Sequence, residues 1–192
     1  TPGLSTTNHE NKMGIRTSIT SDVVLEDVRI PAEQRLGEEG TGFATAMKTL
    51  DLARMFVGCL AVGIAQRALD EGIAYTKTRQ QFGRPVAKNQ ALQFKMADMA
   101  IQIEAARQVV SHAHTLADLG KPYGKEAAMA KCLAGDVAVQ VALEGIQLFG
   151  GYGYSREYPV EKLLRDAKIF QIFEGTNEIQ RVVIANHILG KF

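Results

Sequence analysis

Hydrophobic residues recur at steps near 3.6 along most of the chain, which is the periodicity of an amphipathic helix. The pattern begins after Gly42 and continues to Leu189, with glycine or proline interruptions in segments 80–85, 120–122 and 150–151. Such residues end helices. The pattern therefore predicts helices over residues 43–50, 52–78, 88–119, 124–149, 160–169 and 177–189. Long helices joined by short loops are typical of an antiparallel bundle, so the predicted fold class is mainly α.

The first forty residues follow a different pattern. Val24, Glu26, Val28 and Ile30 alternate at period two in a segment rich in β-branched residues, and Pro31 ends it. This predicts one or two strands between residues 12 and 30. One or two strands do not form a stable sheet alone. They must pair with something outside the chain or pack against the helices that follow the turn-rich segment 37–42.

Composition narrows the class of protein. Of 192 residues, 46% are hydrophobic and 22% charged, as in an ordinary globular protein. Lys and Arg number 22 against 21 Asp and Glu, a net charge of +1, which argues against a nucleic-acid partner held by a strong basic field. The longest apolar stretch, residues 55–65, is too short to span a bilayer, so no membrane insertion is expected.

Cys59 and Cys132 are the only cysteines. Both lie in apolar helical patterns, which favours two buried thiols over one disulfide. Two cysteines are too few for a cysteine-rich metal site, and the sequence predicts no metal ligand.

Glu174 is the most notable candidate for chemistry. It follows an apolar run and precedes Gly175 and Thr176 at the start of the last predicted helix. One interpretation is a carboxylate stabilised by the helix dipole. The other is a general base, whose apolar neighbours exclude water and raise its basicity, while Gly175 lets a substrate approach the backbone.

Two further segments have both a structural and a functional interpretation. The glycines from Gly150 follow a predicted helix, so they indicate a helix-terminating turn and not a Rossmann or Walker phosphate loop. Arg79 ends a long helix and either interacts with that helix end or grips a phosphate. Arg165 and Asp166 are interpreted as a structural ion pair. These residues alone establish a helical domain and no specific reaction.

Four ordered motifs together resemble the acyl-CoA dehydrogenase family, from about residue 12 to the C-terminus. They are the segments TRQQFGR at 78–84 with Gln90 beyond it, QLFGGYG at 147–153, EYPVEK at 157–162, and RDAKIFQIFEGTNEIQR at 165–181. The resemblance implies that residues 1–36 are the remnant of a middle β domain. Residues 37–192 would then form the C-terminal four-helix bundle, an antiparallel bundle preceded by a short β remnant.

The resemblance also assigns roles, residue by residue. Glu174 corresponds to the catalytic base, which removes the α-proton of an acyl-CoA while a hydride leaves the β-carbon for FAD. Asp51, Leu52, Ala53 and Arg54 match a segment that contacts CoA, and Gly175 would line the substrate path. The implied FAD contacts are Arg79, Phe82, Gln90, Gln147, Leu148, Phe149, Gly150, Gly151, Thr176, Asn177 and Glu178, of which Arg79 and Gln90 would reach the FAD of a neighbouring subunit.

One position bears on the subtype. Isovaleryl- and long-chain-type members carry the base as a glutamate just before the arginine of the first long helix. That place holds Ala53 here, so the chain resembles short-chain, medium-chain or other generic members.

The resemblance implies a homodimer or homotetramer, electron-transferring flavoprotein as electron acceptor, and a cytoplasmic or mitochondrial-matrix location in bacteria or eukaryotes respectively. We expect this chain alone to retain little or no FAD, because most flavin contacts belong to the missing middle domain. Two alternatives stay open: a non-catalytic helical oligomerisation module, and part of an oxidase of the same architecture.

Overall fold

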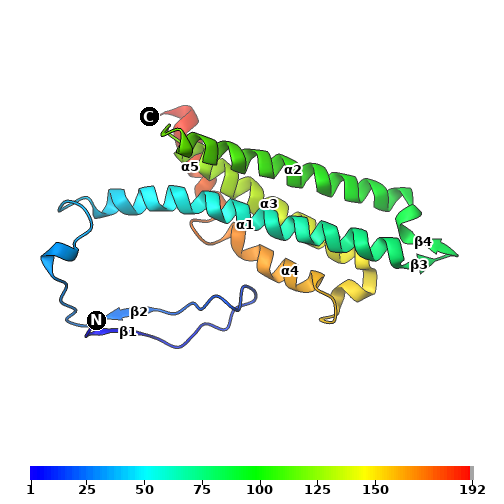
Figure 1. The fold of residues 1–192 in the computed structure, drawn as a ribbon, viewed down its shortest axis with the longest axis horizontal. Helices are drawn as coiled ribbons and strands as arrows, with labels where there is room; N and C mark the ends of the chain where they lie inside the picture. Colours follow the sequence, from blue (N-terminus) through cyan, green and yellow to red (C-terminus); the bar gives the residue numbers. More distant parts are fainter. Residues whose placement is uncertain (191–192) are drawn as a thin grey trace.

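The computed structural model describes residues 1–190 and is mainly helical, as the hydrophobic pattern predicts (Figure 1). The last two residues of the predicted 37–192 domain lie outside the described residues. Three long helices run back and forth along the molecule, and two shorter helices pack against them. The helices are α1 (Gly42–Thr78), α2 (Gln90–Asp118), α3 (Gly124–Phe149), α4 (Val160–Ala167) and α5 (Asn177–Leu189).

Helix α1 is continuous over 37 residues, so the predicted break near residue 51 is wrong. Neither glycine nor proline occurs there. Arg54 Nη1 forms an ion pair with Asp51 Oδ1 within the same helix, at 2.6 Å. Nearly all of its first turns are exposed. The backbone thus stays helical even where the core does not support it.

The core lies between α1 and α3 and is built largely from small side chains. Ala61, Ala65 and Ala68 of α1 face Ala138 and other buried alanines of α3. A Cβ added at Gly145 would lie 3.3 Å from the Cβ of Ala68, which shows how closely the two helices approach. Helix α2 completes the core with buried apolar side chains, namely Met99, Ile103, Ala106 and Val110.

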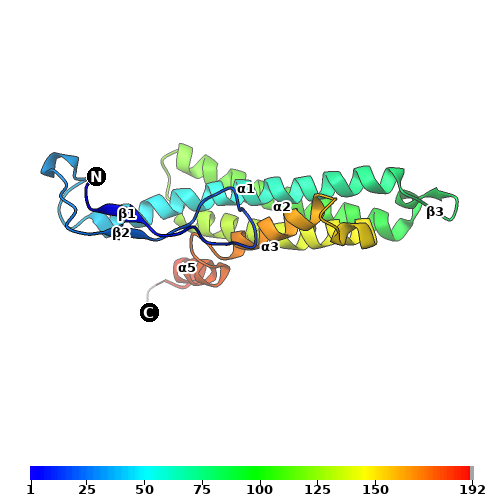
Figure 2. The ribbon, with the colours of Figure 1, turned by 90° about the horizontal axis from the view of Figure 1, so that it is seen from below.

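The N-terminal segment forms its own small hairpin. Strand β1 (Leu4–Thr6) pairs antiparallel with β2 (Val23–Leu25). The prediction located β2 correctly but missed β1, which lies upstream of the predicted range and supplies a partner within the chain. Figures 1 and 2 show this segment as an arm beside the helical body.

The arm contacts the bundle at the loop between its strands. The backbone N–H of Ile15 donates to Asp166 Oδ1 at 2.6 Å, and Arg165 Nη1 donates to the Met13 carbonyl at 2.8 Å. Arg165 and Asp166 do not pair with each other, so that prediction is wrong. Each instead binds a residue one helical turn earlier, Glu161 and Lys162 respectively, because neighbours in sequence point in different directions on a helix.

The predicted loop after α1 contains a small hairpin, β3 (Gln80–Gln81) paired with β4 (Arg84–Pro85). The two residues between the strands, Phe82 and Gly83, both have positive φ angles of 52° and 76°. Two such residues form the turn that matches the twist of a hairpin. The segment between the end of α1 and the start of α2 therefore has a regular hairpin structure.

The two cysteines differ in exposure. Cys132 is buried, but Cys59 is exposed, so the prediction of two buried thiols is wrong for Cys59. Both thiols are free. The periodicity of α1 placed Cys59 in an apolar context, but one side of this helix has no covering partner within the described chain.

By length and composition, two helices could cross a membrane: Gly42–Thr78, and Gly124–Tyr154, which includes the turn after α3. Within the bundle, 50% and 56% of their apolar windows are buried, as in the core helices of a soluble protein. The test therefore gives only weak evidence for a membrane-spanning helix.

Candidate functional site

Glu174 lies in a turn between the short 3-10 helix η4 (Lys168–Gln171) and α5. Its φ angle is 56°, and that of Gly175 is 89°. A left-handed backbone is uncommon for a residue other than glycine and costs on the order of 1 kcal/mol or more. Contacts around the turn must therefore hold Glu174 in this conformation. Its side chain is half-buried.

Two buried side chains hold this turn through its carbonyl groups. Gln180 Nε2 donates to the carbonyls of Glu174 at 3.2 Å and Gly175 at 2.9 Å. Lys131 Nζ, from α3, donates to the Gly175 carbonyl at 2.7 Å. The Thr176 hydroxyl accepts the Ile179 N–H at 3.3 Å and caps α5. The turn is thereby joined to both α3 and α5.

The backbone N–H of Glu174 makes no hydrogen bond to another part of residues 1–190. A donor left available beside a half-buried carboxylate can bind a carbonyl oxygen of a ligand. The turn therefore offers an acceptor for a proton and a donor for an oxygen from the same residue.

A polar network lies behind the turn. The side chain of Asn177 is buried, accepts from Lys131 Nζ at 2.9 Å, and donates to Asp136 Oδ1 at 2.8 Å. Asp136 also accepts from Gln171 and Arg181. Burial raises the pKa of Asp136, but these hydrogen bonds outweigh it and hold the pKa below its usual value. This network fixes the N-terminus of α5.

Arg54 brings the predicted CoA-binding segment to the same place. Its side chain is buried and ion-paired with Asp51, and Nη2 lies 3.9 Å from where a Cβ of Gly175 would be. Ala53 is half-buried, and Leu52 is exposed. The structure thus brings the turn of Glu174 and Gly175 next to Asp51 and Arg54, although about 120 residues separate the two segments in the sequence.

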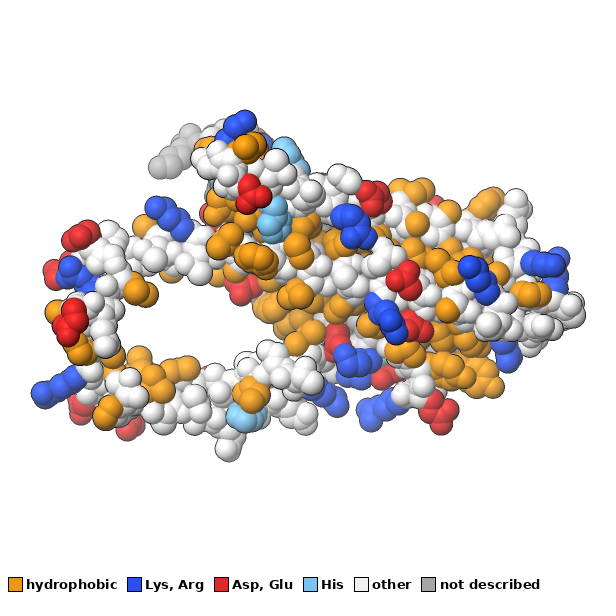
Figure 3. Space-filling view, viewed as in Figure 1, with side chains coloured by type: hydrophobic (Ala, Val, Ile, Leu, Met, Phe, Trp, Pro, Cys, Tyr) orange, Lys and Arg blue, Asp and Glu red, His pale blue; other side chains and the backbone are white. Residues whose placement is uncertain are grey.

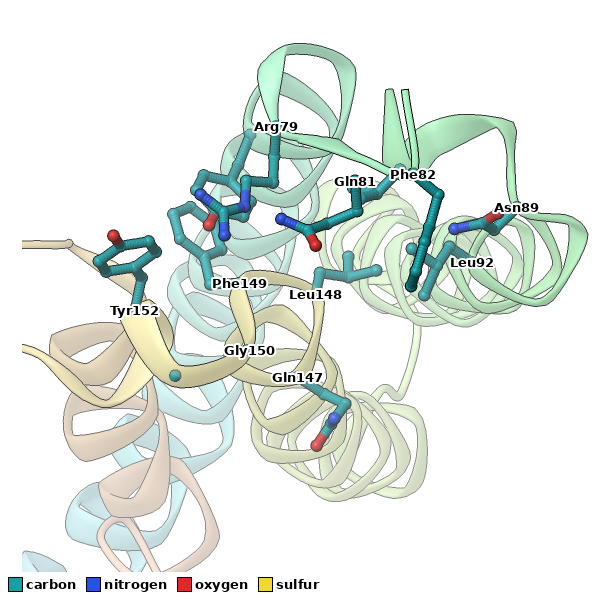
Figure 4. Close-up of a pocket in the computed structure, with 13 residues that line it drawn as sticks. Arg79, Gln81, Phe82, Asn89, Leu92, Gln147, Leu148, Phe149, Gly150 and Tyr152 are labelled. Atoms are coloured by element: carbon teal, nitrogen blue, oxygen red, sulfur yellow. The ribbon is translucent and has the colours of Figure 1, made fainter. Parts of the chain in front are cut away.

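A second site lies at the opposite end of α1 (Figure 4). It is a cavity of about 630 Å³ between the end of α1, the β3–β4 hairpin, the start of α2 and the end of α3. Most of the predicted FAD contacts outside the Glu174 turn line it, namely Arg79, Phe82, Gln147, Leu148, Phe149, Gly150 and Gly151. Gln90 does not line the cavity; the adjacent Asn89 does.

Aromatic side chains line one side of this cavity. Tyr75 and Phe149 stack with ring centroids 4.1 Å apart, and the guanidinium carbon of Arg79 lies 5.4 Å from the ring centroid of Tyr152. Gly150 ends α3 with a φ angle of 60°, and its N–H donates to the Gln147 carbonyl. The segment is therefore the helix-terminating turn that the sequence indicates.

The residues of the cavity fit part of a dinucleotide cofactor. Arg79 is exposed and can bind a phosphate in a bidentate manner. Tyr152 offers a flat apolar face to an aromatic ring. A Cβ at Gly150 or Gly151 would meet nothing within 4 Å, so a ligand has room to approach the backbone there.

The two sites do not meet within one chain. About 25 residues of α1 separate Arg54 from Arg79, which corresponds to roughly 37 Å along a helix. Thr176 and Glu178, two further predicted FAD contacts, lie at the Glu174 end, and the side chain of Asn177 points into the protein. A cofactor that uses both groups of residues would therefore need two copies of the chain.

Several residues of these sites were missed in the sequence. Tyr75 lies one helical turn before Arg79, and Tyr152 lies within the glycine-rich segment. Lys131 interrupts a run of buried alanines on α3, and a lone lysine on an apolar helix face is the signal that identifies it. Gln180 carried no comparable signal.

Comparisons with known proteins agree on one family. The family model described as "Acyl-CoA dehydrogenase, C-terminal domain" matches residues 40–189. The mitochondrial short-chain specific acyl-CoA dehydrogenase of Bos taurus is 48% identical over all of this chain and 47% of its own length. The chain spans about half the length of the curated relatives it matches.

Two solved structures are also similar to this chain. The butyryl-CoA dehydrogenase of Megasphaera elsdenii superposes with a TM-score of 0.97 at 52% identity, over 98% of this chain and 49% of that one. A chain in a structure described as the electron transferring flavoprotein of Acidaminococcus fermentans gives a TM-score of 0.97 at 52% identity, over 99% and 50% of the two chains.

Proposed function

The chain belongs to the acyl-CoA dehydrogenase family, and on that premise we propose that it is the C-terminal part of an FAD-dependent enzyme that introduces a double bond between the α- and β-carbons of an acyl-CoA. The observation that carries the proposal is the turn of Glu174. Glu174 carries both a half-buried carboxylate and a backbone N–H that has no partner within residues 1–190, and the buried Arg54 lies next to Gly175 in the same turn.

In this proposal Glu174 is the catalytic base. Its carboxylate takes the proton from the α-carbon, and the C–H electron pair forms the new double bond as a hydride leaves the β-carbon. FAD, when bound, supplies the hydride acceptor. The Glu174 N–H donates to the thioester oxygen, where negative charge develops, and such a preorganised donor lowers the barrier.

The proposed acyl-CoA site extends from this turn along the start of α1. Asp51, Leu52, Ala53 and Arg54 would contact the CoA portion. Gly175 would line the path of the substrate. A side chain at Gly175 would come within 2.8 Å of Gln180 Nε2 and would strain a backbone with φ of 89°.

We propose that FAD is shared between subunits. The cavity residues around Arg79, together with Gln90, would bind the phosphate and adenosine portions in one subunit. Thr176, Asn177 and Glu178 would lie beside the flavin in the other. The separation of roughly 37 Å along α1 supports this division, because one chain cannot place both groups on one cofactor.

Exposed apolar side chains support a homodimer or homotetramer (Figure 3). They lie on several helices and include Phe56, Leu60, Phe94, Ile101, Leu143 and Val182. Apolar patches of this kind mark protein interfaces. They also favour a second candidate function, in which the isolated chain is a non-catalytic oligomerisation module that retains little or no FAD. A stoichiometric flavin spectrum of the purified chain between about 350 and 500 nm would overturn this second candidate.

The remaining assignments rest on relatives. Electron-transferring flavoprotein is the proposed electron acceptor, supported by the similar chain in the Acidaminococcus fermentans structure. A cytoplasmic location in a bacterium, or the mitochondrial matrix in a eukaryote, is proposed from the bacterial and mitochondrial relatives. Residues 1–36 are proposed as the end of a preceding β domain, since Ile19, Val23 and Leu25 are exposed in the arm.

The test of the proposed function is Glu174→Gln in the full-length enzyme containing this chain. Flavin reduction by butyryl-CoA without oxygen should slow by about 100-fold or more, as expected for loss of a general base. Glu104→Gln, at an exposed carboxylate on α2, is the matched control and should reduce flavin normally. Near-normal reduction by Glu174→Gln would show that another group is the base.

A further inference from the structure

Lys131 is a buried lysine with no role in the proposed function. It lies in the first half of α3, is 0% exposed, and is flanked by buried residues such as Ala130 and Cys132. Lysine is almost never fully buried unless its charge is paired. Its burial therefore calls for an explanation in its contacts.

The contacts of Lys131 are unusual for a buried charge. Its Nζ donates to the carbonyl of Gly175 at 2.7 Å and to Oδ1 of Asn177 at 2.9 Å, both neutral oxygens. No salt bridge to a carboxylate is found for it within residues 1–190. Burying an ammonium group that only neutral acceptors bind lowers the stability of the fold. Stability alone therefore does not account for a lysine at this position.

We propose that Lys131 is a positioning residue for Glu174: by binding the Gly175 carbonyl it holds the turn in which the Glu174 carboxylate and N–H face the substrate. This inference rests on the proposed function. Gly175 is the next residue after Glu174, and both have left-handed backbone angles. A contact to the carbonyl of Gly175 therefore acts on the strained part of the turn.

The origin of the contact in α3 matters. Gln180 also binds the turn, but it belongs to α5, which begins immediately after the turn, so its bond does not itself reach the core helices. Lys131 is 44 residues away in sequence and lies on the central helix of the core. Its bond joins a carbonyl of the turn directly to α3, whereas Asn177 and Arg181 join α5 to Asp136 of the same helix.

The charge of Lys131 is sensitive to pH near the physiological range. Burial lowers the pKa of the Lys131 ammonium to about 8. Charged and titratable groups face it from three elements: Cys132 and Asp136 on α3, Arg54 on α1, and Glu178 on α5. Above this pKa, the bond to the Gly175 carbonyl loses its charge and weakens, since charge-assisted hydrogen bonds are about twice as strong as neutral ones.

The test uses the full-length, FAD-loaded enzyme and the variant Lys131→Met, which keeps an unbranched side chain one atom shorter and removes the donors. Lys95→Met is the matched control, because Lys95 is a half-buried lysine on α2 that pairs with Glu144 and does not bind the turn. Rates of flavin reduction by butyryl-CoA are measured from pH 6.5 to 9.5. Hydrogen exchange of the peptide covering residues 172–178 gives a second measurement that does not depend on catalysis.

In Lys131→Met we expect the limiting rate of flavin reduction to fall at least tenfold while KM stays within about threefold of its normal value. Exchange in residues 172–178 should be at least tenfold faster. In the normal enzyme the limiting rate should decline through an inflection near pH 8 that Lys131→Met lacks and Lys95→Met retains. If Lys131→Met does not fold, Lys131→Gln, which removes the charge and shortens the side chain but keeps it polar, is measured in the same two ways.

One outcome would overturn the inference: an unchanged limiting rate and unchanged exchange in Lys131→Met or, where that variant does not fold, in Lys131→Gln. The proposed function is judged separately by Glu174→Gln. If Glu174→Gln is inactive and Lys131→Met behaves normally, only the role of Lys131 is wrong. If Glu174→Gln remains active, the proposed function itself is wrong.

Discussion

The guanidinium group of Arg79 lies over the ring of Tyr152, with its central carbon 5.4 Å from the ring centroid. Arg79 ends α1, and Tyr152 lies in the turn after α3, so the contact joins two walls of the cavity. A cation held against an aromatic face keeps its N–H groups directed outward along the plane of the guanidinium. Arg79 is thereby oriented to bind a phosphate.

From this geometry we expect Arg79→Gln in the full-length enzyme to weaken FAD binding roughly 10- to 100-fold. A charge-assisted hydrogen bond is worth about 1.5–3 kcal/mol, which corresponds to that range. Fluorescence titration of the flavin-free enzyme with FAD measures the change. Arg107→Gln, at an exposed arginine on α2, should bind FAD normally. Equal affinities of the two variants would remove Arg79 from the cofactor site.

Two glycines should respond oppositely to alanine. A Cβ at Gly135 would lie 2.7 Å from the carbonyl oxygen of Phe170, whereas one at Gly63 would meet nothing within 4 Å. We expect Gly135→Ala to destabilise the fold by about 1–3 kcal/mol through overpacking. Gly63→Ala should stabilise it by about 0.5–1 kcal/mol, because alanine favours the helix interior. Urea unfolding measures both, and a stable Gly135→Ala variant would mean that η4 is not held against α3.

The stability of the protein should depend on Lys131 at alkaline pH. The pKa of Lys131 is about 8 in the folded chain, against an ordinary value of 10.5. The unfolded chain therefore binds more protons between these values, and the free energy of unfolding should rise with pH across this window. The stabilisation that comes from deprotonating Lys131 is absent below pH 8 and complete above pH 10.5.

The measurement is the difference in the free energy of unfolding between the normal protein and Lys131→Met from pH 7 to 10. Other titrating groups cancel in this difference. Above pH 8, we expect the free energy of unfolding of the normal protein to rise relative to that of Lys131→Met by up to about 1.4 kcal/mol per pH unit. A difference that stays constant over this range would show that the pKa of Lys131 is not lowered.

The N-terminal arm should depend on Asp166. Its carboxylate is buried and accepts the N–H of Ile15. In Asp166→Leu this anchor is lost, so trypsin should cleave after Lys12 and Arg16 several-fold faster than in the normal chain. Asp22→Leu is the control, because the Asp22 side chain is exposed on the arm and makes no hydrogen bond within residues 1–190. Equal cleavage rates would show that other contacts hold the loop.

Part of this architecture follows from local sequence. The 3.6-residue periodicity predicted α2, α3 and α5 nearly to their ends, because a helix face must be apolar where it meets the core. Gly150 ends α3 as predicted, since its left-handed backbone is readily adopted only by glycine. The motifs around Glu174 and Arg79 were visible for the same reason: short segments carry the residues that a site needs.

Other features could not be predicted because they depend on contacts between distant segments. The hydrophobic periodicity did not predict that Cys59 lies on an uncovered side of α1. It also did not predict that Leu4–Thr6 pairs with β2. Nor could it show that Lys131 reaches the carbonyl of Gly175.

The sequence by itself determined the helices, where several of them end, and which segments resemble a flavoenzyme. Only the tertiary structure decided that Glu174 and Arg54 share one site while Arg79 lies at the other end of α1. The physical reason is that helix formation depends on neighbours within a few residues. The position of a side chain relative to a distant one depends on how the rigid helices pack against each other.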